Sequence, residues 1–329
     1  MLLRRDIVEA MNVSYNRTFT DALEEASESA LVSTLVTETT STAGRENYAW
    51  MLDYVRMRKW IGEREVSDDE VREYFIRNDE YEATVKTKIR DIQDGVYALQ
   101  AQSKIQQLAD AYPDYKNDFI VDLMLNGFDG KGPDGVPFFS EEHPWGHIEK
   151  VENRGAETYQ FVADGQFSNM TDAEFSEDAL WNAREAMRKF KNHKGRTANV
   201  RPDTLVVGPA LEREARKLLT YDRIVKVEGG TPIEQRNESQ GLYTLIVEDR
   251  LDDSGRWFLF DSSKRIKPFI FQLRQAPIIQ MTSAFTPTAN QGEIDFYAFT
   301  KNEILHGIYA RFGGGYGVPA YAYASTAGE

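Results

Sequence analysis

The strongest constraint on the fold is a long stretch with helical periodicity in the first half of the chain. Apolar side chains recur there at spacings of three and four: Tyr97, Ala101, Ile105, Leu108 and Tyr112, then Tyr115, Phe119 and Leu123. Pro113 lies between the two runs, so we expect either a kink or a helix that restarts at the proline. Asp91 or Asp94 is the expected N-cap, and the glycine at 127 ends the stretch. The pattern predicts a helical spine over residues 92–126.

Strand signals precede this helix. Tyr81, Ala83, Val85 and Ile89 share one face of an alternating run whose other face is charged. A second short run at 74–76 and turn residues at 67–69 and 78–79 complete the pattern of an extended two-stranded loop over residues 60–90. An isolated hairpin is marginally stable in water, so this loop needs a neighbouring surface. Its candidate interface residues are Trp60, Arg64, Tyr74, Tyr81, Lys86 and Lys88.

The second half of the chain alternates helix and strand signals before it becomes β-rich. Residues 129–168 have the composition of a loop region. Ser176 is the expected cap of a helix, and residues 204–207 are a buried strand that leads into a helix at Pro209. Further strands are expected at 256–261, 267–272 and 296–312, with Trp257, Phe269, Phe271 and Phe299 as sheet aromatics. The glycines at 313, 314, 315 and 317 indicate a flexible turn that ends the sheet.

Composition excludes several classes of protein. A formal net charge of −14 disfavours a surface built to neutralise nucleic-acid phosphates. The absence of cysteine removes disulfides, thiolate metal sites and cysteine nucleophiles. No window has the apolar length of a membrane span, and the first residues lack the pattern of a secretory signal.

Residues 1–48 mix helix formers with a polar run at 38–44, which fits either an arm that lies on another surface or a frayed terminus.

The search for chemical motifs predicts no catalytic, cofactor or metal site. His143 and His147 have a helical metal-ligand spacing, but Pro144 and Gly146 between them oppose a helix, so we favour a loop with locally bonded histidines. The glycine run lacks the Lys-Ser/Thr of a phosphate-binding loop. An isopeptide bond from Lys86 or Lys88 to a neighbour's asparagine is possible in principle, but a solvated strand face explains both lysines more simply.

Several strings, in order, resemble the Mu-like phage major head subunit family. They are RKWIGER (58–64), YEATV (81–85), DIQD (91–94), YPD (112–114), NGF (126–128), FFSEEHP (138–144), VVGPAL (206–211), WFLFD (257–261) and KPFIFQ (267–272). Each string is weak alone, but together they span most of the chain. The sequence departs from the family pattern at Gly208, where a second proline is expected, and in the acidic run at 67–73.

The resemblance implies an α+β, Hong Kong 97-type capsid fold. The expected parts are an N-terminal arm (1–50), then residues 51–175 with an extended "E-loop" (about 60–90) and a peripheral domain that carries the spine helix (about 92–126). An axial α/β domain (176–260) and a returning peripheral sheet with a C-terminal tail (261–329) follow.

The implied function is that of a major capsid protein that assembles into hexamers and pentamers of an icosahedral head. Implied partners are other copies of itself, a scaffold or protease-scaffold protein, a portal protein, possible decoration proteins and nonspecifically held double-stranded DNA. Assembly in the host cytoplasm and residence in the virion follow. The alternatives are an encapsulin-like compartment shell and a soluble α/β enzyme such as a hydrolase or metal-dependent enzyme.

Overall fold

The computed structural model describes residues 5–52, 73–93, 97–153, 156–228, 231–251, 255–282 and 296–327. The helices are α1 (Arg5–Glu25), α2 (Ala30–Leu35), α3 (Ile89–Gln93), α4 (Tyr97–Leu125), α5 (Glu177–Lys189), α6 (Pro209–Thr220) and α7 (Phe296–Lys301), with short 3-10 turns η1 (Ala49–Leu52), η2 (Asn126–Phe128) and η3 (Pro319–Tyr321). The strands are β1 (Val36–Thr40), β2 (Arg45–Asn47), β3 (Phe75–Arg77), β4 (Asp79–Lys88), β5 (His143–Asn153), β6 (Ala156–Phe167), β7 (Met170–Thr171), β8 (Thr204–Val207), β9 (Arg223–Glu228), β10 (Thr231–Arg236), β11 (Thr244–Val247), β12 (Trp257–Phe260), β13 (Phe269–Met281), β14 (Glu303–Tyr316) and β15 (Ala322–Ser325).

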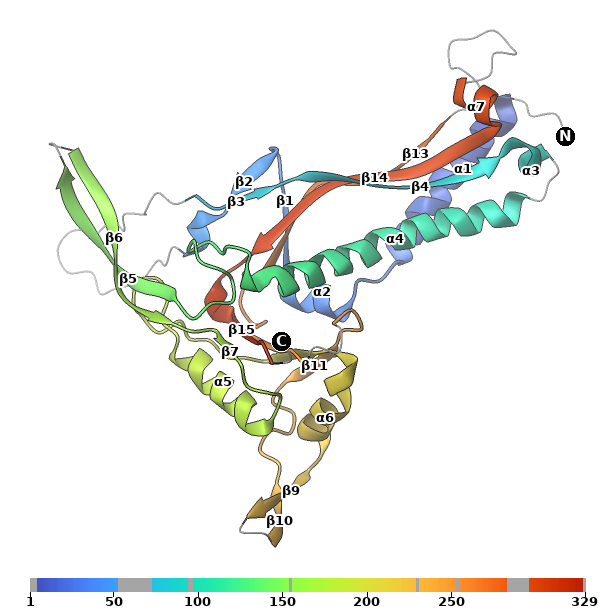
Figure 1. The fold of residues 1–329 in the computed structure, drawn as a ribbon. Helices are drawn as coiled ribbons and strands as arrows, with labels where there is room; N and C mark the ends of the chain where they lie inside the picture. Colours follow the sequence, from blue (N-terminus) through green and yellow to red (C-terminus); the bar gives the residue numbers. More distant parts are fainter. Residues whose placement is uncertain are drawn as a thin grey trace.

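A long four-stranded sheet forms one half of the molecule, in the order β1-β13-β14-β4 (Figure 1). β1 runs parallel to β13, and the other pairs are antiparallel. Burial alternates along β14, so the strand presents one apolar face, which includes Ile308 and Phe312, and one half-exposed face. Helices α4 and α1 pack together, and their side chains cluster with those of the apolar face.

A five-stranded sheet forms the centre of the other half, in the order β11-β8-β12-β15-β7. β8, β12 and β15 are buried on both faces, as expected for a sheet covered on two sides. Leu205 and Val207 face a core shared with α5 and α6, whereas Val206 faces a core shared with α4. This alternation joins the two halves of the molecule through one sheet.

Two hairpins project from the body (Figure 1). Among the strands of the described ranges, β5 and β6 pair only with each other, and β9 pairs only with β10. Residues 143–168 were predicted to be a loop region, and that prediction is wrong for the β5–β6 hairpin. The apolar residues that alternate at Tyr159 and Phe161 were the strand signal in this segment.

The predicted pairing of the loop over 60–90 is also wrong. The run at 74–76 does not pair with 81–89: β3 pairs with β2, with Asn47 opposite Phe75, and β4 pairs with β14 inside the long sheet. Apolar alternation along β4 therefore reflects its packing over α4. Trp60 and Arg64 lie outside the described residues.

The spine prediction is confirmed in outline and corrected in detail. Residues 97–125 form one helix with Pro113 inside it, so the helix does not restart at the proline. Asp91 is not the cap, because it lies within the separate short helix α3, and Asp94 lies outside the described residues.

The polar run at 38–44 begins within strand β1, which pairs with β13, and continues beyond its end. Ser176 caps α5 as predicted, since its side chain accepts a hydrogen bond from the Ala179 backbone N–H at 3.1 Å.

Three predictions for the last third of the chain are corrected. Residues 296–301 form helix α7, so Phe299 is not a sheet residue. Trp257 lies in β12 of the five-stranded sheet and not in the peripheral sheet, whereas Phe269 and Phe271 lie in β13 of the long sheet. The five-stranded sheet also takes β7 and β15 from outside the 176–260 block.

The prediction for the glycine run is also wrong. Gly313, Gly314 and Gly315 are paired residues of β14, opposite β13, and do not form a flexible turn. A Cβ atom on Gly313 would overlap the backbone carbonyl of Arg77 in β3, and one on Gly314 would overlap the Phe119 ring of α4. The run allows β3 and α4 to approach the strand closely.

Candidate assembly surfaces

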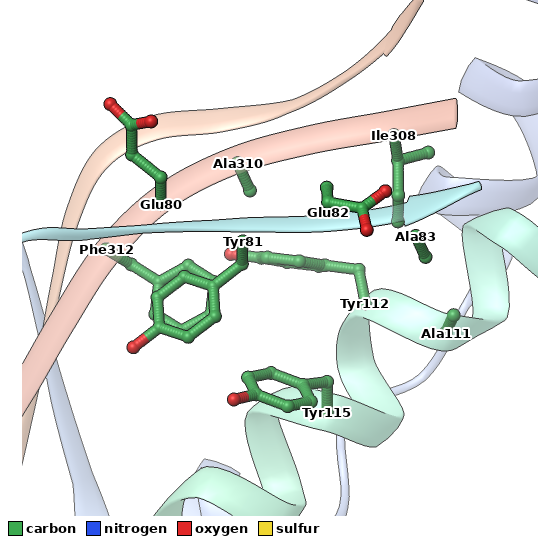
Figure 2. A pocket seen from close by; sticks show the side chains of 10 residues that line it. All are labelled: Glu80, Tyr81, Glu82, Ala83, Ala111, Tyr112, Tyr115, Ile308, Ala310 and Phe312. Carbon is green, nitrogen blue, oxygen red and sulfur yellow. The ribbon is translucent and has the colours of Figure 1, made fainter. Parts of the chain in front are cut away.

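An open, largely apolar groove lies between α4 and the strands β4 and β14 (Figure 2). Its volume is about 330 Å³, and it is lined by Glu80, Tyr81, Glu82, Ala83, Ala111, Tyr112, Tyr115, Ile308, Ala310 and Phe312. Glu80 and Glu82 are exposed at its rim, and Tyr115 is 45% exposed. The groove therefore has an aromatic floor that is partly open to solvent at Tyr115, and the Glu80 side chain points away from that floor (Figure 2).

The floor is an aromatic cluster centred on Phe312. The Tyr81 ring stacks on Phe312 with centroids 4.0 Å apart, and Phe271 lies 4.9 Å, Phe119 5.7 Å and Tyr112 6.1 Å from the same ring. Burial raises the pKa of Tyr81 to about 12 and raises that of Tyr112 further, so both phenols stay neutral. The structure thus brings together residues that the sequence assigned separately to the loop, the spine and the sheet.

The other predicted spine residues pack between helices. Ile105 and Leu108 are buried with Tyr15 and Phe19 of α1. The side chain of Tyr97 lies outside the described set. The arm helix α1 is therefore docked on its own subunit.

Tyr74 contacts β14 within the same subunit. Its hydroxyl oxygen accepts a hydrogen bond from the backbone N–H of Tyr316 at 2.6 Å. Burial raises the pKa of this phenol strongly. A role for Tyr74 at an interface between copies remains a prediction.

Lys86 and Lys88 lie on the solvent side of β4, as predicted, and both are exposed. The Lys86 ammonium pairs with Glu303 at 3.2 Å, and the Lys86 carbonyl accepts from the Lys104 ammonium at 3.0 Å. β4 is the last strand of its sheet, so these lysines line a sheet edge.

The base of the β5–β6 hairpin is held by buried and stacked groups. His143 is fully buried, and its Nδ1 lies 2.6 Å from a carboxylate oxygen of Asp134. The Gly146 N–H donates to the His193 carbonyl at 2.9 Å, and the Lys191 ammonium lies 3.5 Å from the Trp145 ring centroid. The hairpin therefore leaves the body in a fixed direction. Sequence reasoning missed this surface.

The loop predicted around the two histidines is wrong. His143 and His147 lie in one strand, and His143 is bonded to Asp134. Within the described residues no group of His, Asp and Glu has the arrangement of a metal site. None of the helices in the described ranges has an apolar stretch long enough to cross a bilayer.

Comparisons with known proteins agree with this architecture. The family model described as "Mu-like prophage major head subunit gpT" matches residues 8–164, 148–251 and 232–328. The FluMu major head subunit of Haemophilus influenzae is 24% identical over 312 residues, which cover 75% of this chain and 98% of that protein. The major capsid protein of Escherichia phage Mu is 24% identical over 318 residues, which cover 76% of this chain and all of that protein.

A solved structure shows the same fold. A chain from the procapsid of bacteriophage JBD30 superposes with a TM-score of 0.56 at 21% identity, over 98% of this chain and 76% of that chain. The spine helix beside a long sheet, joined to an α/β half, is the Hong Kong 97-type capsid fold. The family match favours a phage head over an encapsulin-like compartment. The chain belongs to the Mu-like prophage major head subunit family and is a major capsid protein of a tailed phage.

Proposed function

We propose that this subunit forms hexamers and pentamers that close into an icosahedral head around double-stranded DNA. The α/β half, which corresponds to the expected axial domain (176–260), makes the contacts within each ring. The projecting segments overlap neighbouring copies and lock the lattice. The work is burial of apolar area over several modest interfaces, so that misplaced subunits dissociate and assembly corrects itself. No catalytic step, cofactor or metal takes part.

The β5–β6 hairpin is the observation that carries this proposal. β5 and β6 form a two-stranded sheet that pairs with no third strand among the described residues. Such a hairpin is marginal in water unless it lies on another surface. Its base is nevertheless fixed by His143 and Gly146, so the outer part is directed away from the subunit. We infer that adjacent copies cover it.

We propose the connection between β2 and β3 as a second segment that contacts neighbouring copies. Because β2 and β3 are paired, the chain between Asn47 and Phe75 starts and ends at one place. We assign the E-loop to this connection and not to residues 60–90, since β4 belongs to the long sheet. Trp60 and Arg64 remain its candidate interface residues.

The remaining partners follow from the role of a head subunit. We propose a scaffold or protease-scaffold protein, a portal protein and possible decoration proteins as protein partners. Contact with packaged DNA is nonspecific, which suits a chain with a net charge of −14. Assembly takes place in the host cytoplasm and the product is the virion shell.

The test shortens the hairpin without touching its base. Replacing residues 149–160 by Asn-Gly keeps the paired residues Ile148 and Phe161 and closes them with a two-residue turn. We expect the variant to fold with the urea midpoint of the wild type but to form no closed shells when it is co-expressed with its assembly partners. Electron microscopy is the readout, and normal shells from this variant would refute the mechanism.

A further inference from the structure

The outer edge of β4 has backbone groups that no strand of the described chain pairs. β4 ends the long sheet and pairs with β14 on one side. Leu305, opposite Lys86, exchanges hydrogen bonds with Thr282 on its other side, at 2.9 and 3.0 Å. In an antiparallel pair, two residues that lie opposite each other either exchange backbone hydrogen bonds or both direct these groups away from one another. Because Leu305 bonds Thr282, the N–H and C=O groups of Lys86 point away from β14. The Lys104 ammonium bonds this carbonyl from outside, which agrees.

The same alternation applies along the strand. The even-numbered residues from Glu80 to Lys88 direct their backbone groups toward the free edge. Their side chains lie on the solvent face of the sheet, and all are exposed. The acidic members Glu80 and Glu82 occupy the first half, and the basic members Lys86 and Lys88 the second, with Thr84 in the middle.

This order of charges is self-complementary in one arrangement. If two β4 strands pair antiparallel with Thr84 opposite Thr84, each Glu80 lies opposite Lys88 and each Glu82 opposite Lys86. A shift of the register by two residues leaves at least one of these four side chains without an opposite charge in the strand. A parallel pair in register places like charges side by side, which is destabilising.

The contacts within one chain leave these groups available. Lys86 pairs with Glu303 and Glu80 with Arg311, but Lys86 is 65% and Glu80 is 66% exposed. Their partners are less exposed, Glu303 at 14% and Arg311 at 31%, but the exposed ends of Lys86 and Glu80 can also reach a second copy. Lys104 has to release the Lys86 carbonyl, and its flexible side chain permits this.

The same pairing would also bury part of the aromatic groove. Tyr81, Ala83 and Val85 lie on the opposite face of β4 from the charges, and Tyr81 and Ala83 line the groove beside this edge (Figure 2). With Thr84 opposite Thr84, Val85 of the second copy lies opposite Ala83. The second strand would therefore cover part of the groove's apolar margin.

We propose that β4 pairs with β4 of a second copy across a two-fold axis at Thr84, which joins two four-stranded sheets into one. The contact is isologous, so it closes after two copies and does not propagate into fibres. It rests on the proposed function, because it gives the shell a two-fold contact between subunits. A competing explanation for the charged side chains is that they prevent the edge of β4 from pairing with any other strand.

A single cysteine tests the register, because the chain has none of its own. In the Thr84→Cys variant, the paired Cα atoms would lie about 5.5 Å apart, within the range of a disulfide. The control is Gln280→Cys: Gln280 is exposed in β13 and pairs with Gly307, which pairs with Thr84. Two copies of residue 280 would be about 24 Å apart, at about 4.8 Å per strand.

Assembled particles of each variant are oxidised and run on a non-reducing denaturing gel. We expect a dimer band for Thr84→Cys and only monomer for Gln280→Cys. Monomer in Thr84→Cys particles overturns the β4 contact and leaves the shell function standing. Absence of particles from the wild-type chain overturns the shell function, and with it the contact that rests on it.

Charge exchange provides an independent test. The variant with Glu80→Lys and Glu82→Lys opposes lysine with lysine, and the variant with Lys86→Glu and Lys88→Glu opposes glutamate with glutamate. We expect each to reduce particle yield at least tenfold, while all four changes together restore it. All four side chains are exposed, but within the chain Lys86→Glu faces Glu303 and Glu80→Lys faces Arg311. Urea unfolding of each unassembled variant therefore separates a loss of stability from a loss of the contact. Wild-type yield from both half-exchanged variants would establish the guarding role instead.

Discussion

Glycines in β14 control how closely its neighbours approach, and a series of alanine variants tests this. A methyl group on Gly313 would overlap the Arg77 carbonyl, a backbone group that cannot rotate away. A methyl group on Gly314 would meet side-chain atoms of Phe119 and Leu123, which can adjust in part. Overpacking costs about 1–3 kcal/mol, so we expect Gly313→Ala near or above the top of this range and Gly314→Ala near the bottom. The order of the two variants is the prediction.

Gly44 is the matched control, because nothing lies within 4 Å of the position a Cβ would take there. Gly44→Ala should be neutral or stabilising by up to about 1 kcal/mol, since it restricts the unfolded chain. Urea unfolding of the unassembled subunit, followed by tryptophan fluorescence, gives the three free energies of unfolding. If Gly313→Ala unfolds at the wild-type urea concentration, β3 does not pack against β14 as described and the reasoning is refuted.

Three further predictions concern single side chains. Phe312→Ala should cost about 3–5 kcal/mol, because the ring is 1% exposed at the centre of the aromatic cluster; a loss below 1 kcal/mol in urea unfolding would contradict this. Burial, with a smaller effect of Lys104, lowers the pKa of His306 to about 4, so the unfolded state takes up its proton first as pH falls. Stability from this group should be complete above about pH 6.5 and decline by at most about 3 kcal/mol toward pH 4; His306→Gln should flatten that part of the stability profile, and an unchanged profile would exclude the group as its source. Ser176→Ala removes the cap of α5 and should lower the free energy of unfolding by about 1 kcal/mol, whereas an unchanged urea midpoint would mean that the cap is replaced by water.

Local signals predicted the elements whose stability is local. The helical stripe located α4, the Ser176 cap located α5, and the run at 204–207 located β8. Each of these patterns has one period and a clear boundary, so neighbours in space were not needed to interpret it.

Pairing partners could not be predicted in the same way. The alternation along β4 identifies a strand with one apolar face, but the same alternation suits a hairpin or the edge of a large sheet. The partner, β14, lies more than two hundred residues away in the chain. The prediction of a flexible turn at the glycine run was wrong for a related reason, since the close neighbours Arg77 and Phe119 are also distant in sequence.

Which candidate residues come together also depends on contacts between parts of the chain that are distant in sequence. Tyr81 was chosen from the strand alternation and Tyr112 and Phe119 from the helical stripe, and all three meet at Phe312. The β5–β6 hairpin was missed because Pro144 and Gly146 at its start are typical of loops, and the buried pair of His143 and Asp134 that fixes it is a tertiary contact. Residues that act only between copies leave no pattern of burial within one chain.

The central claim is that copies of this chain close into a container by covering one another's projecting segments. Electron cryo-microscopy of the subunit, co-expressed with its assembly partners, tests it most directly. We predict closed shells in which the β5–β6 hairpin lies on an adjacent copy. Small discrete oligomers, or shells in which both faces of that hairpin remain in solvent, would contradict the claim.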